Sequence, residues 1–156
     1  MDIMNDLDIL GDIDWSTAIF DNGLTLEGTL RQEAERFKKC VEDEIQKYYD
    51  SYSPVMYSRT NAFQNSVEIQ DMVNMNIDVG QMSIMVGFND DAYHPSLFGG
   101  DKGYVPALIN DGWSWKNQPQ TSIYRFTYFD GTGFFERAIA EFLSDNPYGV
   151  TVDIIK

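Results

Sequence analysis

A single amphipathic helix, from Thr29 to about Tyr52, constrains most strongly what this chain can fold into. Its apolar side chains recur at intervals of three and four residues, at Leu30, Ala34, Phe37, Val41, Ile45, Tyr48 and Tyr52. This spacing places them in one stripe along a helix with about 3.6 residues per turn. The stripe must be buried, so we expect other parts of the chain to pack against it.

Each end of this helix carries a sequence signal. Thr29 and Gln32 fit a capping box, in which the two side chains satisfy free backbone amides, whereas Thr25 would cap a helix that starts earlier. Pro54 lacks an amide hydrogen and disfavours helical angles at Ser53. We therefore expect the helix to stop before Pro54 and the chain to turn there.

The other elements are predicted from residue alternation and turn residues. Apolar residues alternate from Val67 to Val79 and from Met82 to Phe88, which predicts an antiparallel hairpin that turns at Gly80-Gln81, after one helical turn at Thr60–Gln64. Next we expect a loop at residues 89–103, a helical turn at 104–111 and a polar loop at 113–121. A strand at 123–129, a second amphipathic helix at 134–143 and a last strand at 150–154 should follow. This order predicts an α+β fold with a small, mainly antiparallel sheet, the long helix across one face and a second C-terminal helix.

Length and charge limit the class of protein. The 156 residues predict one α+β domain, residues 25–156, preceded by an acidic N-terminal arm, residues 1–24, that orders by docking. The formal net charge of −14 argues against a protein that binds DNA phosphates. The apolar runs are far shorter than the roughly 20 residues of a membrane span, and one cysteine fits a reducing cytoplasm.

Candidate catalytic and metal-binding residues are few. Cys40 abuts the apolar stripe and fits a small buried hydrophobe, while His94 is the one histidine around which a nucleophilic site could form. Asp90, Asp91 and His94 could bind a metal, although aspartates also make turns. Asp130-Gly131-Thr132-Gly133 could bind an anion, or form a tight turn and a helix cap. We predict no enzyme, cofactor or metal site.

Aromatic residues in polar surroundings are candidate partner contacts. Trp113 and Trp115 flank one serine in the predicted polar loop, and Trp15 and Phe20 lie in the acidic arm. Exposed aromatics are typical of surfaces that a partner covers. We predict that these four residues contact other subunits.

Several short motifs resemble the tail-completion or minor capsid family of long-tailed bacteriophages, the head-tail joining proteins. They are Pro54-Val-Met-Tyr-Ser-Arg59-Thr60-Asn-Ala-Phe63-Gln-Asn-Ser66, Val86-Gly87, Tyr104 to Gly112, and Gly133-Phe-Phe-Glu-Arg-Ala138. They occur in the family's order over about residues 29–145. Departures include Asp111 where the family usually has Glu, and the acidic arm.

The resemblance implies a non-enzymatic assembly protein of the phage neck or tail. It would be made in the bacterial cytoplasm, form a ring of identical subunits, contact neighbouring neck or tail subunits, and bind neither specific nucleic-acid sequences nor membranes. The motif residues expected to be structural are Arg59, Thr60, Phe63, Ser66, Asp111 and Gly112, with Arg59 expected to bind a carboxylate such as Asp111 or backbone carbonyls. The acidic charge leaves a second class open, a DNA mimic that inhibits a host defence enzyme.

Overall fold

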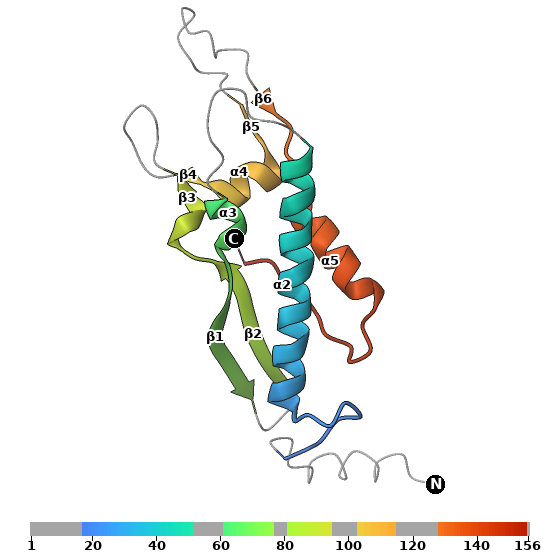
Figure 1. Cartoon of the computed structure of the whole chain (residues 1–156). Coiled ribbons are helices and arrows are strands. Elements are labelled where there is room, and N and C mark those ends of the chain that lie inside the picture. The colour runs from blue at the N-terminus through green and yellow to red at the C-terminus, as the bar shows by residue number, and fades with distance from the viewer. Residues whose placement is uncertain (1–16, 52–60, 77–80, 95–102, 115–127, 156) are drawn as a thin grey trace, which may run out of the picture. The chain divides into compact units, whose positions relative to one another are not determined.

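The computed structural model describes residues 17–51, 61–76, 81–94, 103–114 and 128–155 (Figure 1). The elements in chain order are α2 (Leu26–Asp50), α3 (Ala62–Asn65), β1 (Val67–Asn76), β2 (Gln81–Phe88), the 3-10 helix η2 (Asp90–Ala92), β3 (Tyr93–His94), β4 (Gly103–Tyr104), α4 (Val105–Asp111), β5 (Trp113–Ser114), β6 (Tyr128–Phe129) and α5 (Phe134–Ser144). The predicted α+β class, with a long helix, antiparallel strands and a second helix, is confirmed.

The described strands form three separate two-stranded ribbons. β1 pairs with β2 in the predicted hairpin, β3 with β4, and β5 with β6 (Figure 1). Tyr93 is opposite Tyr104 in the second ribbon, and Trp113 is opposite Phe129 in the third. Short ribbons of this kind depend on helices and loops for stability, because two strands alone are marginal in water.

The chain divides into two compact units, and α2 contributes residues to both. Unit 1 comprises Met1–Arg36 and Ile69–Gly87, and unit 2 comprises Phe37–Glu68 and Phe88–Lys156. The predicted arm at residues 1–24 and the predicted domain at residues 25–156 stay predictions.

In unit 1, Asn22 fastens the segment that leads into α2. Its side chain accepts a hydrogen bond from Leu24 N (3.0 Å) and donates to Thr29 Oγ1 (3.2 Å) and Gln32 Oε1 (3.1 Å). Thr25 Oγ1 accepts from Gly28 N at 3.2 Å, so Thr25 caps a helix that begins at Leu26. The capping box at Thr29 is wrong, because Thr29 lies buried within the helix and its hydroxyl is bonded to Asn22.

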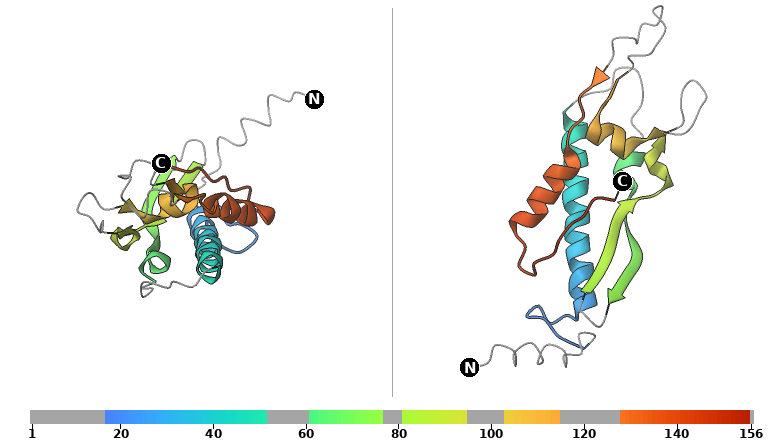
Figure 2. Two further views of the ribbon diagram at one scale, coloured as in Figure 1. Left: turned by 90° about the horizontal axis from the view of Figure 1, so that it is seen from above. Right: turned by 180° about the vertical axis from the view of Figure 1, so that it is seen from behind.

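In unit 2, aromatic rings form the core. α5 lies alongside the part of α2 that belongs to this unit (Figure 2), and Phe134, Phe142 and Ile45 are at most 1% exposed. Aromatic pairs at these separations add to the free energy gained by burying their surface. The ring contacts include Phe37–Phe142, Tyr49–Phe63, Phe63–Phe88 and Phe63–Phe134, with centroids 5.3, 6.4, 5.7 and 5.9 Å apart.

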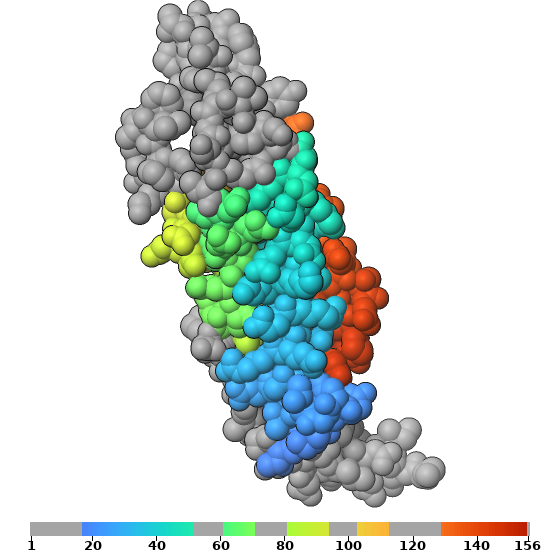
Figure 3. All heavy atoms as spheres, in the orientation of Figure 1, coloured from blue at the N-terminus to red at the C-terminus, as the bar shows by residue number. Residues whose placement is uncertain are grey.

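The apolar stripe of α2 is largely confirmed. Ala34, Val41 and Ile45 are buried, whereas Leu30, Phe37 and Tyr48 are half-buried. Cys40, predicted as a small buried hydrophobe, is half-buried, so its burial is only partial. Other side chains of α2, mostly charged, are open to solvent over much of the face shown in Figure 3. Tyr52 and Pro54 lie outside the described residues, and α2 ends at Asp50.

Three predicted segments differ from the structure. Trp113–Ser114 is strand β5 and not loop, because two close-packed glycines beside it bring β6 within pairing distance. Residues 89–103 include η2 and β3, since the Asn89 side chain accepts from Asp91 N (3.0 Å) and caps the 3-10 turn. Residues 150–154 form no strand, because alternation favours an extended backbone but does not supply a partner strand.

The four remaining predictions have mixed outcomes. The turn expected at Thr60–Gln64 is confirmed as α3, the turn expected at 104–111 as α4, and the second amphipathic helix as α5. The strand expected at 123–129 is described only at Tyr128–Phe129, since residues 115–127 lie outside the described residues.

Candidate functional site at the junction of α4 and α5

Asn110, near the end of α4, joins α4 to the start of α5. It is buried, and its side-chain oxygen accepts from Phe135 N at 2.8 Å. Its side-chain nitrogen donates to Asp111 Oδ1 at 2.9 Å and lies 3.4 Å from Glu136 Oε1. This one amide therefore satisfies backbone and side-chain groups of both helices, which fixes their spacing.

The backbone of the Asp130–Gly133 turn completes this junction. Thr132 N donates to Ile109 O (2.8 Å) and Gly133 N donates to Asn110 O (3.1 Å), so these amides satisfy carbonyls at the end of α4. The same amides would have to be free if the turn bound an anion. The interpretation as a tight turn and helix cap is therefore confirmed, with Gly133 in a left-handed conformation at the helix start.

Gly112 and Gly131 pack against each other across the junction. A Cβ atom on Gly112 would lie 2.3 Å from Phe129 O, and one on Gly131 would lie 2.4 Å from Asn110 O. Both have positive φ angles, of 86° and 82°. Only glycine allows backbones to approach this closely in such a conformation, so both positions are restricted to glycine for geometric reasons.

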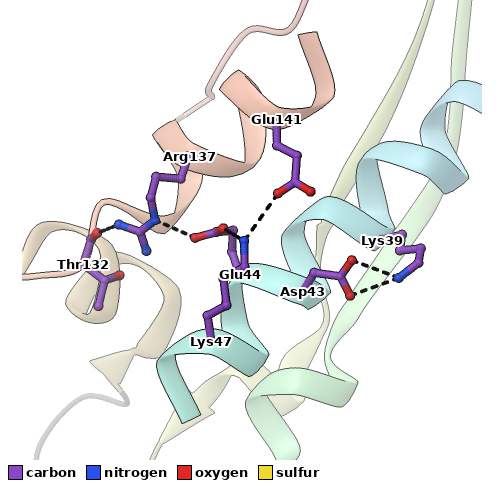
Figure 4. A network of polar contacts seen from close by, with 7 residues as sticks. All are labelled: Lys39, Asp43, Glu44, Lys47, Thr132, Arg137 and Glu141. Atoms are coloured by element: carbon purple, nitrogen blue, oxygen red, sulfur yellow. Dashed lines mark hydrogen bonds and ion pairs between the residues drawn. The ribbon is translucent and has the colours of Figure 1, made fainter. Parts of the chain in front are cut away.

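A buried carboxylate connects this junction to α2. Glu44 is 2% exposed, and its oxygens accept from Arg137 Nε (2.6 Å) and Lys47 Nζ (2.5 Å), as Figure 4 shows. Arg137 also donates to Thr132 O in the turn, and Lys47 lies 3.6 Å from Glu141. One guanidinium thus links α2, the turn and α5.

The charges around Glu44 determine its protonation. Burial by itself raises the pKa of the Glu44 carboxyl, but hydrogen bonds from Lys47 and Arg137, together with their positive charges, outweigh it. The pKa of Glu44 therefore lies below its ordinary value. In turn, the hydrogen bond to Glu44 and the negative charge of that carboxylate raise the pKa of Lys47. A carboxylate that stays ionised and bonded in this way holds helices together and is a poor proton donor.

Four of the ten sequence-predicted site residues are fully described in unit 2. Phe63 and Ser66 are buried; the Ser66 hydroxyl donates to Phe63 O (2.6 Å) and Ser66 O accepts from Asn89 N (2.8 Å). Asp111 is exposed beside Asn110, and Gly112 is the C-cap of α4. Phe63 and Ser66 belong to α3 and its cap, whereas Asp111 and Gly112 belong to the junction.

The other predicted site residues are only partly described. Phe20 is half-buried, and its backbone oxygen accepts from Gly23 N at 2.9 Å. Trp113 is described through its backbone in β5 alone. Arg59, Thr60, Trp15 and Trp115 lie outside the described residues, so the predicted contact between Arg59 and Asp111 stays a prediction.

Sequence reasoning missed the central residues of the junction. Glu44 and Arg137 are 93 positions apart, so no local spacing connects them. Asn110 was included in a motif but given no role. A signal was present for Glu44, since it lies beside Ile45 and one turn from Val41 on a helix whose apolar face is buried.

The same described ranges offer little that could bind a metal ion or a small molecule. There, no three His, Cys, Asp or Glu side chains gather closely enough to hold a metal ion. A shallow hollow of about 380 Å³ in unit 1 is lined by Arg31, Gln32, Glu35 and Ile69, whose charges are of both signs. None of the helices found in these ranges has the length and apolar character needed to span a bilayer.

Comparisons with known proteins add no assignment. No protein-family model, curated protein or solved structure matches this chain.

Proposed function

We propose that this chain is a non-enzymatic assembly protein of a long-tailed bacteriophage, acting in head-tail joining or tail completion. In this proposal it works in the virion neck or tail, as a ring of identical subunits in contact with neighbouring neck or tail subunits. It is made in the host cytoplasm and binds neither specific nucleic-acid sequences nor membranes.

The observation that carries the proposal is the meeting of two resembling segments at one junction. Tyr104 to Gly112 and Gly133 to Ala138 are separated in sequence, yet the side chain and backbone of Asn110 bond to Phe135 N and Gly133 N and join them. A motif that serves a structural joint need not carry catalytic groups, which agrees with a junction made of helix caps, close-packed glycines and ion pairs. The resembling segments thus have a common structural purpose that short chance matches would not be expected to share.

The proposal is tested in a phage genome that encodes this chain. Changing both Trp113 and Trp115 to serine, or deleting residues 1–16, which keeps the Asn22 contacts, should leave the circular dichroism of the purified protein nearly unchanged. Filled heads and tails should then accumulate without joining, or tails should be incomplete, because losing anchors of this kind costs about 2 kcal/mol or more each. The matched control changes both tryptophans to phenylalanine, which keeps aromatic contact surface and should preserve assembly.

Two results decide against the proposal. Wild-type numbers of infectious, fully tailed particles from the double serine variant would place these tryptophans outside every essential contact. Tight, salt-sensitive binding of the purified chain to a defence nuclease, in competition with duplex DNA, would favour a DNA mimic instead.

A further inference from the structure

Residues 150–155 belong to no helix or strand, are rich in β-branched side chains and have no described partner strand. The segment reads Val150-Thr-Val-Asp-Ile-Ile155, with one charged residue, and Ile154 and Ile155 are 45% and 80% exposed. Such residues favour a pleated strand. No backbone hydrogen bond joins residues 151–155 to other described residues.

The start of this segment is nevertheless fixed. The Asn146 side chain accepts from Val150 N (2.8 Å) and donates to Val150 O (2.9 Å), and Gly149 N donates to Asn146 O (3.3 Å). These bonds follow directly on α5 and set where the segment leaves the helix. An extended segment with a fixed start loses less conformational entropy on pairing than a free one.

Strand β2 has an edge with no residue that would prevent another strand from pairing with it. Its eight residues, Gln81–Phe88, contain no charge and no proline, and its ladder has β1 as the one described partner. Edge strands usually carry charges or proline that prevent pairing with other chains. The sequence of β1 includes two acidic residues, Glu68 and Asp71, whereas that of β2 includes none.

We propose that residues 150–155 of one copy add as a strand to the free edge of β2 in a second copy. Backbone amides and carbonyls of the two segments would pair, and alternate side chains would pack on the ribbon. The added strand would turn a marginal two-stranded ribbon into a three-stranded sheet.

The charges of the two segments are compatible with a second copy as the occupant. Each chain has a formal net charge of −14, so two copies repel unless their contact avoids acidic surface. Residues 150–155 contain one acidic residue and β2 contains none, so a contact between these two segments avoids acidic surface. Donor and acceptor differ, so the contact is heterologous and can propagate; that it closes a ring rests on the proposed function.

Hydrogen exchange of the purified full chain tests the pairing directly. Protection of the amides in residues 151–155 and along β2 should rise together as protein concentration rises, in parallel with the mass seen by light scattering. Protection that is the same at every concentration would mean pairing within one chain, and would overturn the proposal. A monomer with unprotected amides at millimolar concentration would overturn it as well.

Variants separate backbone pairing from side-chain effects. Val152→Pro removes an amide hydrogen outside every described helix and strand, and should weaken self-association by about tenfold or more. Val152→Thr keeps both the amide and the β-branch and should associate as the wild type does. Ser83→Lys should weaken association by guarding β2, whereas Ser144→Lys, at an exposed position of α5, should not.

A peptide gives a readout that does not depend on ring formation. A labelled peptide of residues 147–156 should bind saturably to the full chain carrying Val152→Pro, and the same peptide with that substitution should not. Absence of binding by the unmodified peptide would overturn strand addition, whereas binding without any phage role would overturn the proposed function alone.

Discussion

The two units differ in how far along the sequence their described side-chain bonds reach. In unit 1, the bonds between Asn22 and Gln32 and between Arg36 and Glu33 join residues ten and three positions apart. In unit 2, Asn110 bonds to Phe135 N over 25 positions, and Arg137 bonds to Glu44 over 93. Both units share α2, so the difference does not follow from helix content.

The comparison extends to what α2 buries in each unit. Its buried residues in unit 1 are Thr29, Glu33 and Ala34, which are small or polar. In unit 2 they are Val41, Glu44, Ile45 and Tyr49. Large apolar side chains contribute more free energy on burial than small or polar ones. We infer that burial of α2 residues contributes more free energy in unit 2 than in unit 1.

The largest expected effect comes from Gly112, which packs closely against the backbone of residues 129–131. Gly112→Ala should destabilise the fold by more than about 4 kcal/mol or prevent folding. The new Cβ atom would overlap Phe129 O, and the φ of 86° at residue 112 is strained for alanine. In unit 1, Gly23→Ala should cost about 1 kcal/mol, since its Cβ would meet nothing within 4 Å despite a φ of 78°. Urea unfolding measures both, and equal costs would break the comparison.

The next effect concerns the apolar stripe. Ile45→Ala should cost about 3 kcal/mol because it empties a fully buried site, while Leu30→Ala at a half-buried site should cost about 1. Lys38→Ala is the surface control and should stay within about 0.5 kcal/mol, although Lys38 lies 3.7 Å from Glu42. Similar small costs for all three in urea melts would mean that the stripe is not the source of stability.

The third effect depends on pH. Because the pKa of Glu44 is lower in the folded chain, its contribution is complete above the unfolded value, about 4.3, and is lost as pH falls through the folded pKa. The raised pKa of Lys47 acts at the alkaline end, where stability is lost as pH rises through the folded value.

Glu44→Gln should therefore cost about 1 to 2 kcal/mol at neutral pH, and less as the pH falls below about 4. The exposed Glu35→Gln is the charge-matched control. In thermal melts across acid pH, the melting temperature should fall less steeply with falling pH for Glu44→Gln than for the wild type, and Glu35→Gln should behave as the wild type does. A wild-type acid slope in that variant would show that Glu44 is not the linked group.

The smallest expected effect concerns the helix cap at Thr25 in unit 1. Thr25→Ala removes the oxygen that accepts from Gly28 N and should cost about 1 kcal/mol, whereas Thr25→Ser keeps the cap and should cost less. Hydrogen exchange of the first turn of α2 would locate the loss. Destabilisation as large as that of Ile45→Ala would show that the cap contributes far more than one hydrogen bond.

Sequence by itself determined the elements whose signals are local. The apolar stripe of α2, the alternation of β1 and β2, the apolar face of α5 and the glycine at the end of α4 were all predictable. Each depends on residues a few positions apart, where backbone geometry fixes which side chains share a face. The possibility that Thr25 caps α2 was also available, because capping depends on a bond across one turn.

Only the tertiary structure decided the pairing of distant groups. It buried Glu44, placed Arg137 against it, packed Gly112 on Gly131 and made Trp113–Ser114 a strand beside Tyr128–Phe129. It also left residues 150–155 without a described partner strand, although their alternation favours one. Residue spacing specifies conformation and face, but a partner is selected by three-dimensional packing and charge, which join positions that no local pattern relates.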